Sequence, residues 1–410
     1  MNKLIWLVCL LVVPITAAAQ EKPKVEFRDG DRIALVGNEF FERDQDQAYI
    51  ETQLTTRFPD KNLTFRNLGY SGDTVWADAR SLCAGWANFG PADQGFKRLT
   101  RLVHEINPTL IFVAYGMNES FDGPKGIPHF EQGLNRMLDM LAGTGARLVL
   151  VSPIRHENLG PPLPDPAAHN RNIQLYCAAI KKIAAERHAA YVDLFNALKE
   201  GRGSAPLTSD GIHLTARGYR AAAAAFEGAM GYSPRDWNVA IDAGSPVARG
   251  TTVSNIQRSA TQLTFEAIDA MLPLAPPPEG DVTGSSLPGA RRTLRVSGLQ
   301  PGMYELKSDG RPLIRASADE LARGVHLRTG PAYEQEEQLR KLVITKNFDF
   351  FNYWRPENDT YIFGYRKHEQ GRNAVEIPKF EAMVPASEAK IAKLRVPVSH
   401  TYSLTLVNGK

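Results

Sequence analysis

The sequence predicts an α/β fold, with a five-stranded parallel sheet covered by helices on both faces and a smaller region of strands and helices after it. From Asp31 to about Gly231, short apolar runs alternate with amphipathic stretches, the pattern of parallel strands joined by crossover helices. After Tyr232, prolines and glycines interrupt the chain and the apolar runs become shorter. The 410 residues, 43% hydrophobic and 23% charged, are enough for about two folded domains.

The first 19 residues have the pattern of a secretory signal peptide. Lys3 supplies a positive charge, an apolar run extends from Leu4 to Val13, and the small residues Ala17 to Ala19 suit a signal peptidase. The apolar run is too short to cross a bilayer comfortably. We therefore expect cleavage, export to the periplasm or the medium, and no transmembrane segment afterwards. The alternative is an uncleaved anchor.

Five apolar runs predict the strands of the sheet, and five amphipathic stretches predict its helices. The strands are expected at Arg32–Val36, Leu63–Leu68, Thr109–Tyr115, Arg147–Val151 and Ala190–Leu194. The helices are expected at Gln45–Phe58, Phe96–Ile106, His129–Leu141, Ala167–His188 and Ala216–Met230. In open parallel sheets ligands bind at the carboxyl ends of the strands, so the residues just after each run are where a site is expected.

The second half, residues 232–410, is expected to be an appendage packed on the first. Four runs predict a small antiparallel sheet: Trp237–Ile241, Gln262–Ala267, Arg292–Val296 and Met303–Ser308. A long helix is expected from about Pro331 towards Phe350, and a later one over about Ser387 to Leu394. Aromatic residues around Trp354 and Tyr365 lie next to charged ones, which suits either a carbohydrate surface or a core joining the two halves.

Four short segments fall at strand ends in the first half. They are Gly37-Asn38-Glu39-Phe40, Asn67-Leu68-Gly69-Tyr70-Ser71-Gly72-Asp73-Thr74, Gly116-Met117-Asn118-Glu119 and Asp210-Gly211-Ile212-His213. Each alone is a weak signal, because such combinations of common residues arise by chance. In this order and at strand ends, the four resemble the conserved blocks of the SGNH (GDSL) hydrolase family over about residues 25–231.

The resemblance implies a three-layer α/β/α fold that hydrolyses esters. It assigns the oxyanion hole to the backbone N–H of Gly72 and the side-chain amide of Asn118, donors that stabilise the charge developing on a tetrahedral intermediate. It assigns the general base to His213 and the residue that orients it to Asp210. An imidazole can take and return a proton, and a carboxylate on its other nitrogen fixes the tautomer.

The first segment departs from the family, which has Gly-Asp-Ser there. Glu39 stands at the position of the nucleophilic serine, and Asn38 at that of the aspartate. A carboxylate is already charged near neutral pH, so His213 cannot activate it as it would a hydroxyl. We expect Glu39 to form an ion pair with His213 instead, which would weaken the histidine as a base.

Three functions fit this substitution. The first is hydrolysis of acyl esters of carbohydrates or small molecules, by water activated by His213 or by a displaced nucleophile, for which Ser71 is the hydroxyl nearest in sequence to the oxyanion glycine. The second is an inactive relative that binds a glycan or another small ligand. The third is a glycosidase in which Glu119 or Asp73 completes a carboxylate pair with Glu39.

Residues beside the four segments are candidate substrate contacts. Glu119 and Asp73 are expected to bind substrate. Trp76 and Trp86 follow the Gly72 loop and are expected to line the rim of the pocket, although a loop core would also use them.

Composition and charge argue against several functions. The 48 basic and 45 acidic residues leave a net charge of +3 without long blocks of one sign, so no nucleic-acid partner is expected. No histidine pair has zinc-ligand spacing with suitable companions, and no glycine-rich phosphate loop is present, so neither a metal nor another cofactor is expected. Cys83 and Cys177 could form a disulfide or stay as buried thiols.

Overall fold

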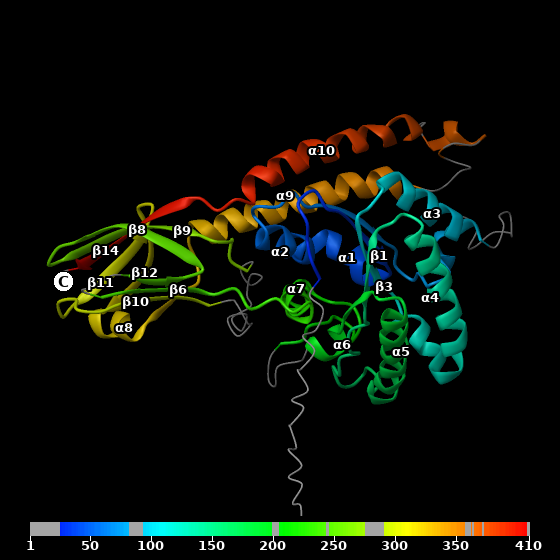
Figure 1. Ribbon diagram of the computed structural model, residues 1–410, viewed down its shortest axis with the longest axis horizontal. Coiled ribbons are helices and arrows are strands. Elements are labelled where there is room, and N and C mark those ends of the chain that lie inside the picture. Colours follow the sequence, from blue (N-terminus) through cyan, green and yellow to red (C-terminus); the bar gives the residue numbers. More distant parts are fainter. Residues whose placement is uncertain are drawn as a thin grey trace, which may run out of the picture.

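The chain folds into an α/β region, a β-sandwich and a pair of long helices. The computed structural model describes residues 25–81, 93–198, 205–242, 246–274, 291–356, 362, 365–370 and 373–407. Figure 1 shows the α/β region at the right, the sandwich at the left and the two helices running along the top. The expected signal peptide, residues 1–19, lies outside the described residues. Within the described ranges, every helix falls short of the length or the hydropathy that a membrane span requires.

A parallel sheet of five strands forms the centre of the α/β region, which confirms the predicted fold class. Its strands are β1 (Arg32–Gly37), β2 (Thr64–Gly69), β3 (Leu110–Ala114), β4 (Arg147–Val151) and β5 (Ala190–Val192). They lie in the order β2-β1-β3-β4-β5, and each neighbouring pair is parallel. β1 and β3 are almost wholly buried, because both faces of the sheet are covered.

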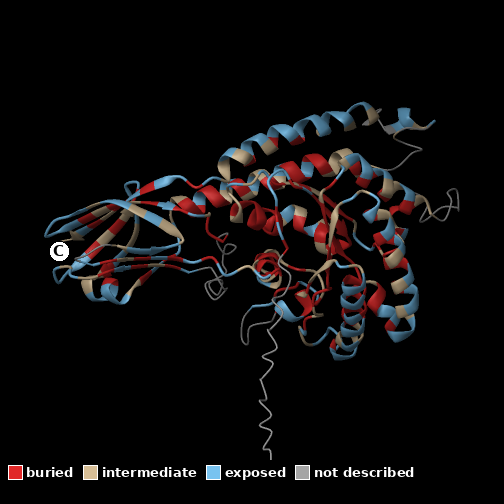
Figure 2. Cartoon of the chain, in the orientation of Figure 1, coloured by how far each residue is buried: buried red, intermediate tan, exposed pale blue. Residues whose placement is uncertain are grey.

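Helices cover both faces and complete the three layers. They are α1 (Glu39–Gln47), α2 (Tyr49–Arg57), α3 (Gln94–Ile106), α4 (Ile127–Ala142), α5 (Ala167–Glu186), α6 (Leu194–Ala197) and α7 (Ala216–Ala229), with short turns η1 (Asp78–Arg80) and η2 (Glu119–Gly126). On β3, Phe112 belongs to the apolar cluster shared with α1, α2 and α7, and its neighbour Val113 to the cluster shared with α3, α4 and α5. Because side chains alternate along a strand, the core is divided between the two faces of the sheet. Figure 2 shows that the interior of the α/β region is buried.

The prediction of a single helix over Gln45–Phe58 is wrong. The structure has two helices there, α1 and α2, which meet at Ala48. Ala48 has a left-handed backbone, with φ of 53°, and its N–H donates to the carbonyl of Asp44. The Asp44 carboxylate then caps the start of α2 by accepting from the N–H groups of Tyr49 at 3.2 Å and Ile50 at 3.3 Å. α1 consequently starts directly after β1 and brings its first turn to the end of the sheet.

The strands after Tyr232 form two sheets, rather than the single antiparallel sheet expected. One has the order β13-β10-β6-β7 and contains the parallel pair β6 and β10, and the other has the order β12-β11-β14-β9-β8 and is antiparallel. The elements are β6 (Trp237–Ile241), β7 (Val247–Arg249), β8 (Thr251–Arg258), β9 (Gln262–Asp269), β10 (Arg292–Val296), β11 (Met303–Ser308), β12 (Arg311–Ser317), α8 (Ala318–Arg323), β13 (Val325–Leu327) and β14 (Ser399–Val407). The sheets share one core, in which Phe265 stacks on Tyr402.

The two long helices, α9 (Pro331–Trp354) and α10 (Ile377–Leu394), pack on the α/β region. Phe350 and Trp354 belong to the apolar cluster of α3, α4 and α5, so these two aromatic residues form a core between the halves of the chain. Lys346 is fully buried and its ammonium pairs with Glu51 at 2.8 Å and donates to the Phe65 carbonyl at 3.0 Å. Because β2 is an edge strand, α9 covers that edge and satisfies one of its carbonyls.

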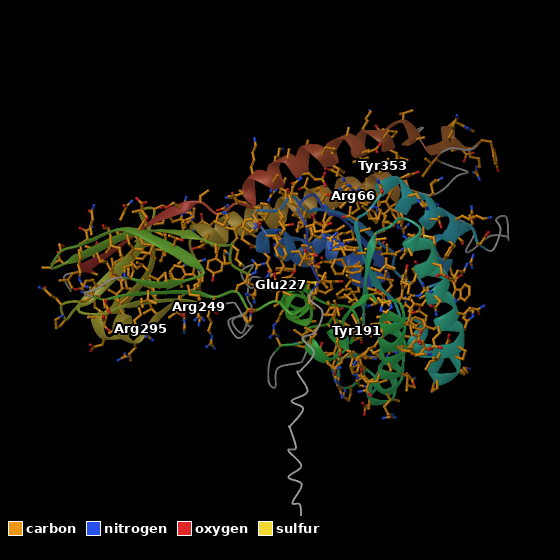
Figure 3. All side chains as sticks on the ribbon, in the orientation of Figure 1. Arg66, Tyr191, Glu227, Arg249, Arg295 and Tyr353 are labelled. Carbon is orange, nitrogen blue, oxygen red and sulfur yellow. The ribbon has the colours of Figure 1, made fainter. Side chains whose placement is uncertain are left out.

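Polar contacts also join the parts of the chain (Figure 3). Arg66 on β2 pairs with Glu388 on α10. Glu227 on α7 accepts from Arg235 at 2.8 Å and from Arg57 at 3.1 Å. The Arg66–Glu388 pair joins β2 to α10, and Glu227 joins α7 to α2 through Arg57 and to the start of the second half through Arg235. Residues 232–410 are divided in space between the sandwich and the helices that pack on the α/β region.

Candidate active site

Three of the four predicted segments meet where β1, β2 and β3 end, and two glycines allow this close approach. A Cβ at Gly37, the last residue of β1, would lie 2.6 Å from the carbonyl oxygen of Ala114 on β3. A Cβ at Gly69, the last residue of β2, would lie 2.2 Å from the backbone nitrogen of Glu42 on α1. Since both positions exclude a side chain, the strand ends and the first turn of α1 can lie in direct contact.

Glu39 is the first residue of α1, and Asn38 caps the helix. The Asn38 side chain accepts from the N–H of Phe40 at 3.2 Å. Glu39 is only 7% exposed. A carboxylate is favoured at a helix N-terminus, where the backbone N–H groups lack partners within the helix. The substitution at the nucleophile position therefore suits the local backbone.

The carboxylate of Glu39 occupies the predicted oxyanion hole. Its Oε2 atom accepts from the N–H of Gly72 at 3.4 Å and from the side-chain amide of Asn118 at 3.2 Å. Asn118 also donates to the carbonyl of Asp73 at 2.9 Å, which fixes its amide. Gly72 has φ of 77°, a conformation that favours glycine. The two donors converge as the sequence predicts, and they converge on this chain's own side chain.

His213 and Asp210 form the predicted proton-transfer pair. Nδ1 of His213 lies 2.6 Å from Oδ2 of Asp210, while Oδ1 of Asp210 accepts from the N–H of His213 at 2.9 Å. Burial opposes ionisation of Asp210, but the hydrogen bonds from His213 outweigh it and lower the pKa of Asp210 to about 2. With Nδ1 committed to the carboxylate, Nε2 of His213 is the nitrogen left to accept a proton.

The ion pair expected between Glu39 and His213 is not formed. Among the described residues, the hydrogen bonds of the Glu39 carboxylate come from Gly72 and Asn118, and the acidic partner of His213 is Asp210. The reason is geometric, because the oxyanion donors lie within reach of the first turn of α1. The histidine therefore keeps its orienting carboxylate.

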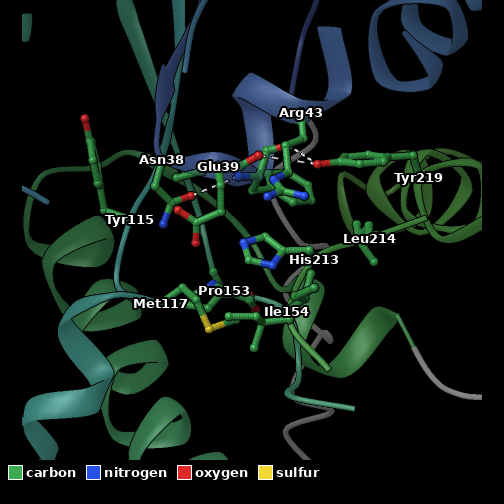
Figure 4. Close-up of a pocket in the computed structure, with 14 residues that line it drawn as sticks. Asn38, Glu39, Arg43, Tyr115, Met117, Pro153, Ile154, His213, Leu214 and Tyr219 are labelled. Carbon is green, nitrogen blue, oxygen red and sulfur yellow. Dashed lines mark hydrogen bonds between the residues drawn. The ribbon is translucent and has the colours of Figure 1, made fainter. Parts of the chain in front are cut away.

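A small pocket holds Glu39 and His213 together (Figure 4). Its free volume is about 20 Å³, which is room for one water molecule. An acyl group can enter only if side chains move. The pocket is lined by Asn38, Glu39, Phe40, Arg43, Ala114, Tyr115, Met117, Ser152, Pro153, Ile154, Ile212, His213, Leu214 and Tyr219.

Each hydroxyl group on the described lining has a structural partner. Ser152 donates to the Pro153 carbonyl at 3.0 Å and accepts from the backbone of Phe195 at 3.0 Å. Tyr219 donates to the Phe40 carbonyl, and Tyr115 donates to Asp73. Ser71, the displaced nucleophile considered from the sequence, is exposed and does not belong to this lining. The described lining thus offers Glu39 or a bound water as the attacking group.

Asp73 lies behind the pocket, fully buried. Its Oδ2 accepts from Nε of Arg80 at 2.6 Å and from the hydroxyl of Tyr115 at 2.9 Å. Arg80 is also buried and donates to the carbonyls of Gly37 and Leu68, the ends of β1 and β2. These contacts indicate that Asp73 positions the oxyanion loop, rather than making the substrate contact predicted for it.

Glu119 is likewise committed to the backbone. Its two carboxylate oxygens accept from the N–H groups of Val75 and Gly116, each at 2.9 Å. Burial raises the pKa of Glu119 to about 7. This side chain ties the Gly72 loop to the Asn118 segment, and it is not part of the pocket lining predicted for it.

Trp76 packs against α4 instead of the described pocket rim. Its ring stacks on His129 with 4.6 Å between the ring centres, and the guanidinium of Arg136 lies over it at 5.7 Å. Cys177 is buried with a free thiol. Trp86 and Cys83 lie outside the described residues, and so does the choice between a Cys83–Cys177 disulfide and two thiols that the sequence left open.

Glu157 positions the loop that carries Asp210 and His213, although nothing in the sequence singled it out. Its carboxylate accepts from the N–H groups of Leu207 at 3.0 Å and Thr208 at 2.7 Å, and from the Thr208 hydroxyl. The backbone N–H of Glu157 donates to the Gly211 carbonyl at 2.7 Å. These partners lie 50 residues or more along the chain, so no local pattern marks Glu157.

Comparisons with known proteins place the α/β region in a family. Residues 30–221 match the model of a family described as GDSL-like lipase/acylhydrolase. Among the described residues, no group of three or more His, Cys, Asp or Glu side chains is arranged to hold a metal ion. A search of curated protein sequences finds no match.

Several solved structures resemble this one. A gut microbial diltiazem-metabolizing enzyme matches with a TM-score of 0.71 and 19% identity, over 94% of this chain and 100% of its own. A catalytic mutant of an acetylxylan esterase from Geobacillus stearothermophilus matches with a TM-score of 0.40 and 17% identity, over 51% of this chain and 98% of its own. A GDSL-like lipase from Bacteroides thetaiotaomicron matches with a TM-score of 0.33 and 18% identity, over 49% and 87%. The first similarity extends through the sandwich and the long helices.

Proposed function

Because its α/β region, residues 30–221, matches the GDSL-like lipase/acylhydrolase family, we propose that the protein hydrolyses acyl esters with a water molecule as the nucleophile. The observation that carries the proposal is that His213, paired with Asp210, lines the same pocket as Glu39, whose carboxylate accepts from the Gly72 and Asn118 donors. A general base and an oxyanion hole are the two parts that attack on an ester carbonyl requires.

Water is the proposed nucleophile because the described hydroxyls that line the pocket are engaged elsewhere and Glu39 is unsuitably placed. An attacking atom must approach the carbonyl carbon, whereas Oε2 of Glu39 lies where the carbonyl oxygen would lie. His213 would take a proton from water through Nε2 and return it to the leaving alcohol. Asp210 would stabilise the imidazolium between these steps.

Glu39 must leave the hole before an ester can react. A carboxylate beside the developing oxyanion would repel it, and the same two donors cannot serve both groups. Substrate binding therefore includes displacement of the Glu39 side chain, and we expect slow turnover. Hydrolysis should become faster when this side chain is shortened.

A second candidate function is ligand binding without turnover. The occupied hole and the room for only one water favour it, because both describe a site closed to an acyl group. The glycosidase alternative is not proposed. Its candidate second carboxylates, Asp73 and Glu119, are committed to Arg80 and to backbone N–H groups.

The proposed substrates are acyl esters of carbohydrates or small molecules, encountered after export from the cell. One of the structural neighbours is an enzyme that metabolizes diltiazem. Diltiazem carries an acetyl ester, so it is a suitable probe beside p-nitrophenyl acetate and an acetylated sugar.

The test is ester hydrolysis by the chain without residues 1–19, assayed beside four variants. Wild type should hydrolyse p-nitrophenyl acetate slowly, and His213→Ala should remove that activity. Asn118→Ala should lower the rate by about a hundredfold or more. Glu39→Ala should raise the rate by freeing the hole, and Glu39→Ser should raise it further by adding a nucleophile.

A histidine-independent rate would contradict the proposed mechanism. If wild type shows no turnover while Glu39→Ser hydrolyses the ester, the site is an esterase site that lacks its nucleophile, and ligand binding becomes the function to pursue. Thermal stabilisation by ligands would then identify what binds.

A further inference from the structure

We infer that Arg43 receives the Glu39 carboxylate when a ligand enters the oxyanion hole. Glu39 and Arg43 lie four residues apart on α1, and both line the pocket (Figure 4). Side chains at this spacing are neighbours on a helix surface, with Cβ atoms about 5–6 Å apart, and an acid followed by a base is the favourable order. The role of Arg43 rests on the proposed function in one respect, since both require a ligand in the hole.

Arg43 is available for this contact. Its side chain is exposed, and no hydrogen bond or ion pair engages its guanidinium within the part of the chain that the structure describes. Two acids on the same helix are committed elsewhere, because Glu42 accepts from the N–H of Ser71 and Asp44 caps α2. Asp46, three residues further on, is close enough for the charge of Arg43 to act on its pKa, but it forms no ion pair with Arg43 among the described residues.

Arg43 can offset the free energy that Glu39 loses when a ligand displaces it from the hole. When a ligand's carbonyl takes the Gly72 and Asn118 donors, the Glu39 carboxylate loses both hydrogen bonds in a position that is only 7% exposed. A buried carboxylate without a partner is unfavourable. An ion pair with Arg43 would offset this loss and make opening of the hole easier. Arg43 is therefore a positioning residue that acts through Glu39 and does not contact the ligand.

The test is a double-mutant cycle on ligand binding, so that it does not depend on turnover. The probe is the hydrate of 1,1,1-trifluoroacetone, a neutral tetrahedral diol of acetyl size, titrated by fluorine NMR. The proteins are wild type, Arg43→Ala, Glu39→Ala and the double variant. A neutral probe is chosen because Arg43 cannot form an ion pair with it.

We expect Arg43→Ala to weaken binding by about two- to fivefold when Glu39 is present and to have no effect on the Glu39→Ala background. Glu39→Ala alone should bind more tightly, because the hole is free. Arg43→Lys should restore binding, since lysine can also pair with a carboxylate four residues earlier. Glu39→Gln is a second background that keeps the side-chain shape, and the effect of Arg43→Ala should vanish there too.

Arg101→Ala is the matched control. Arg101 is an exposed arginine that pairs with Glu105 four residues away on α3, outside the pocket, and its loss should leave binding unchanged in every background. Equal weakening by Arg43→Ala with and without Glu39 would overturn the inference, because Arg43 would then act on the ligand or on the fold. No weakening in the presence of Glu39, or no binding even by Glu39→Ala, would also overturn it.

The two proposals can fail separately. If the cycle gives the expected coupling but wild type hydrolyses no ester, Arg43 has the inferred role in a binding site, and the hydrolase proposal fails. If wild type hydrolyses esters through His213 while Arg43→Ala behaves alike in both backgrounds, the hydrolase proposal stands and the inference fails.

Discussion

The two sides of the pocket are held in different ways. The oxyanion side rests on a buried ion pair, Arg80 with Asp73, and on the buried Glu119, whose carboxyl oxygens accept from two backbone N–H groups. The proton-transfer side is a loop held mainly by one carboxylate, Glu157, with Asp210 and His213 partly exposed.

This difference indicates that the oxyanion side of the pocket is more rigid than the loop that carries His213. Hydrogen-bond donors for an oxyanion must be fixed before the charge develops, because donors that have to reorient contribute less. A histidine that moves protons needs contact with solvent and a partner for one nitrogen. Removal of Arg80, which leaves Asp73 buried without its cation, should therefore damage the oxyanion side more than removal of the Glu157 charge damages the other side.

Arg80→Met should have the largest effect. It leaves the Asp73 carboxylate buried without its cation, and breaking a buried ion pair in this way costs about 3–5 kcal/mol. The free energy of unfolding, measured by urea denaturation, should fall by that amount. Arg101→Ala, which breaks an exposed pair on α3, is the control and should change it by about 1 kcal/mol at most. Equal effects of the two variants would mean that burial of Arg80 matters less than its contacts indicate.

Glu119→Gln should change how stability depends on pH. Because burial raises the pKa of Glu119 from 4.5 to about 7, the folded protein keeps this proton between these pH values and the unfolded chain does not. The contribution of Glu119 to stability is therefore greatest below pH 4.5 and falls as the pH rises to 7, by on the order of 3 kcal/mol.

Denaturation of wild type and Glu119→Gln at several pH values checks this sign. The difference in unfolding free energy, wild type minus variant, should decrease as the pH rises. A constant difference would show that the pKa of Glu119 is the same in the folded and the unfolded chain.

Tyr115→Phe removes a single hydrogen bond to the buried carboxylate of Asp73. A hydrogen bond to a charged group contributes about 1.5–3 kcal/mol, so the unfolding free energy should fall by less than for Arg80→Met. Tyr191→Phe is the control, since its hydroxyl donates to a backbone carbonyl at the long distance of 3.4 Å. If the two variants lose the same stability, the charge on Asp73 does not strengthen the Tyr115 contact.

Glu157→Gln should have the smallest effect on stability. Glutamine keeps one acceptor for the N–H groups of Leu207 and Thr208, so a loss of about 1 kcal/mol is expected. Its effect should appear instead in the His213-dependent hydrolysis rate, because the loop that carries the histidine is less well fixed. A loss of stability as large as that of Arg80→Met would remove the proposed contrast between the two sides.

Much of the fold follows from local patterns in the sequence. Strands are short runs with apolar residues in succession or in alternation, and β4, β6, β10 and β11 have the predicted bounds. The break at Ala48 was not predictable in this way, because no glycine or proline marks it and the Asp44 carboxylate that caps α2 reaches there only after folding. β14 was missed for a related reason, since it joins a sheet whose other strands lie more than 80 residues earlier.

For the site as well, part could be predicted from the sequence and part could not. The sequence contains the four segments in their order, and their resemblance to the SGNH (GDSL) family implied the roles of Gly72, Asn118, Asp210 and His213. The sequence also showed that the nucleophile is replaced by Glu39.

Only the tertiary structure decided what Glu39 does. The sequence favoured a pair between Glu39 and His213 on charge alone, but the first turn of α1 brings the carboxylate to the Gly72 and Asn118 donors instead. The same holds for Asp73 and Glu119, whose partners and burial depend on how loops far apart in sequence pack. Residue type fixes which interactions a side chain can make, and the packing of the strand ends chooses among them.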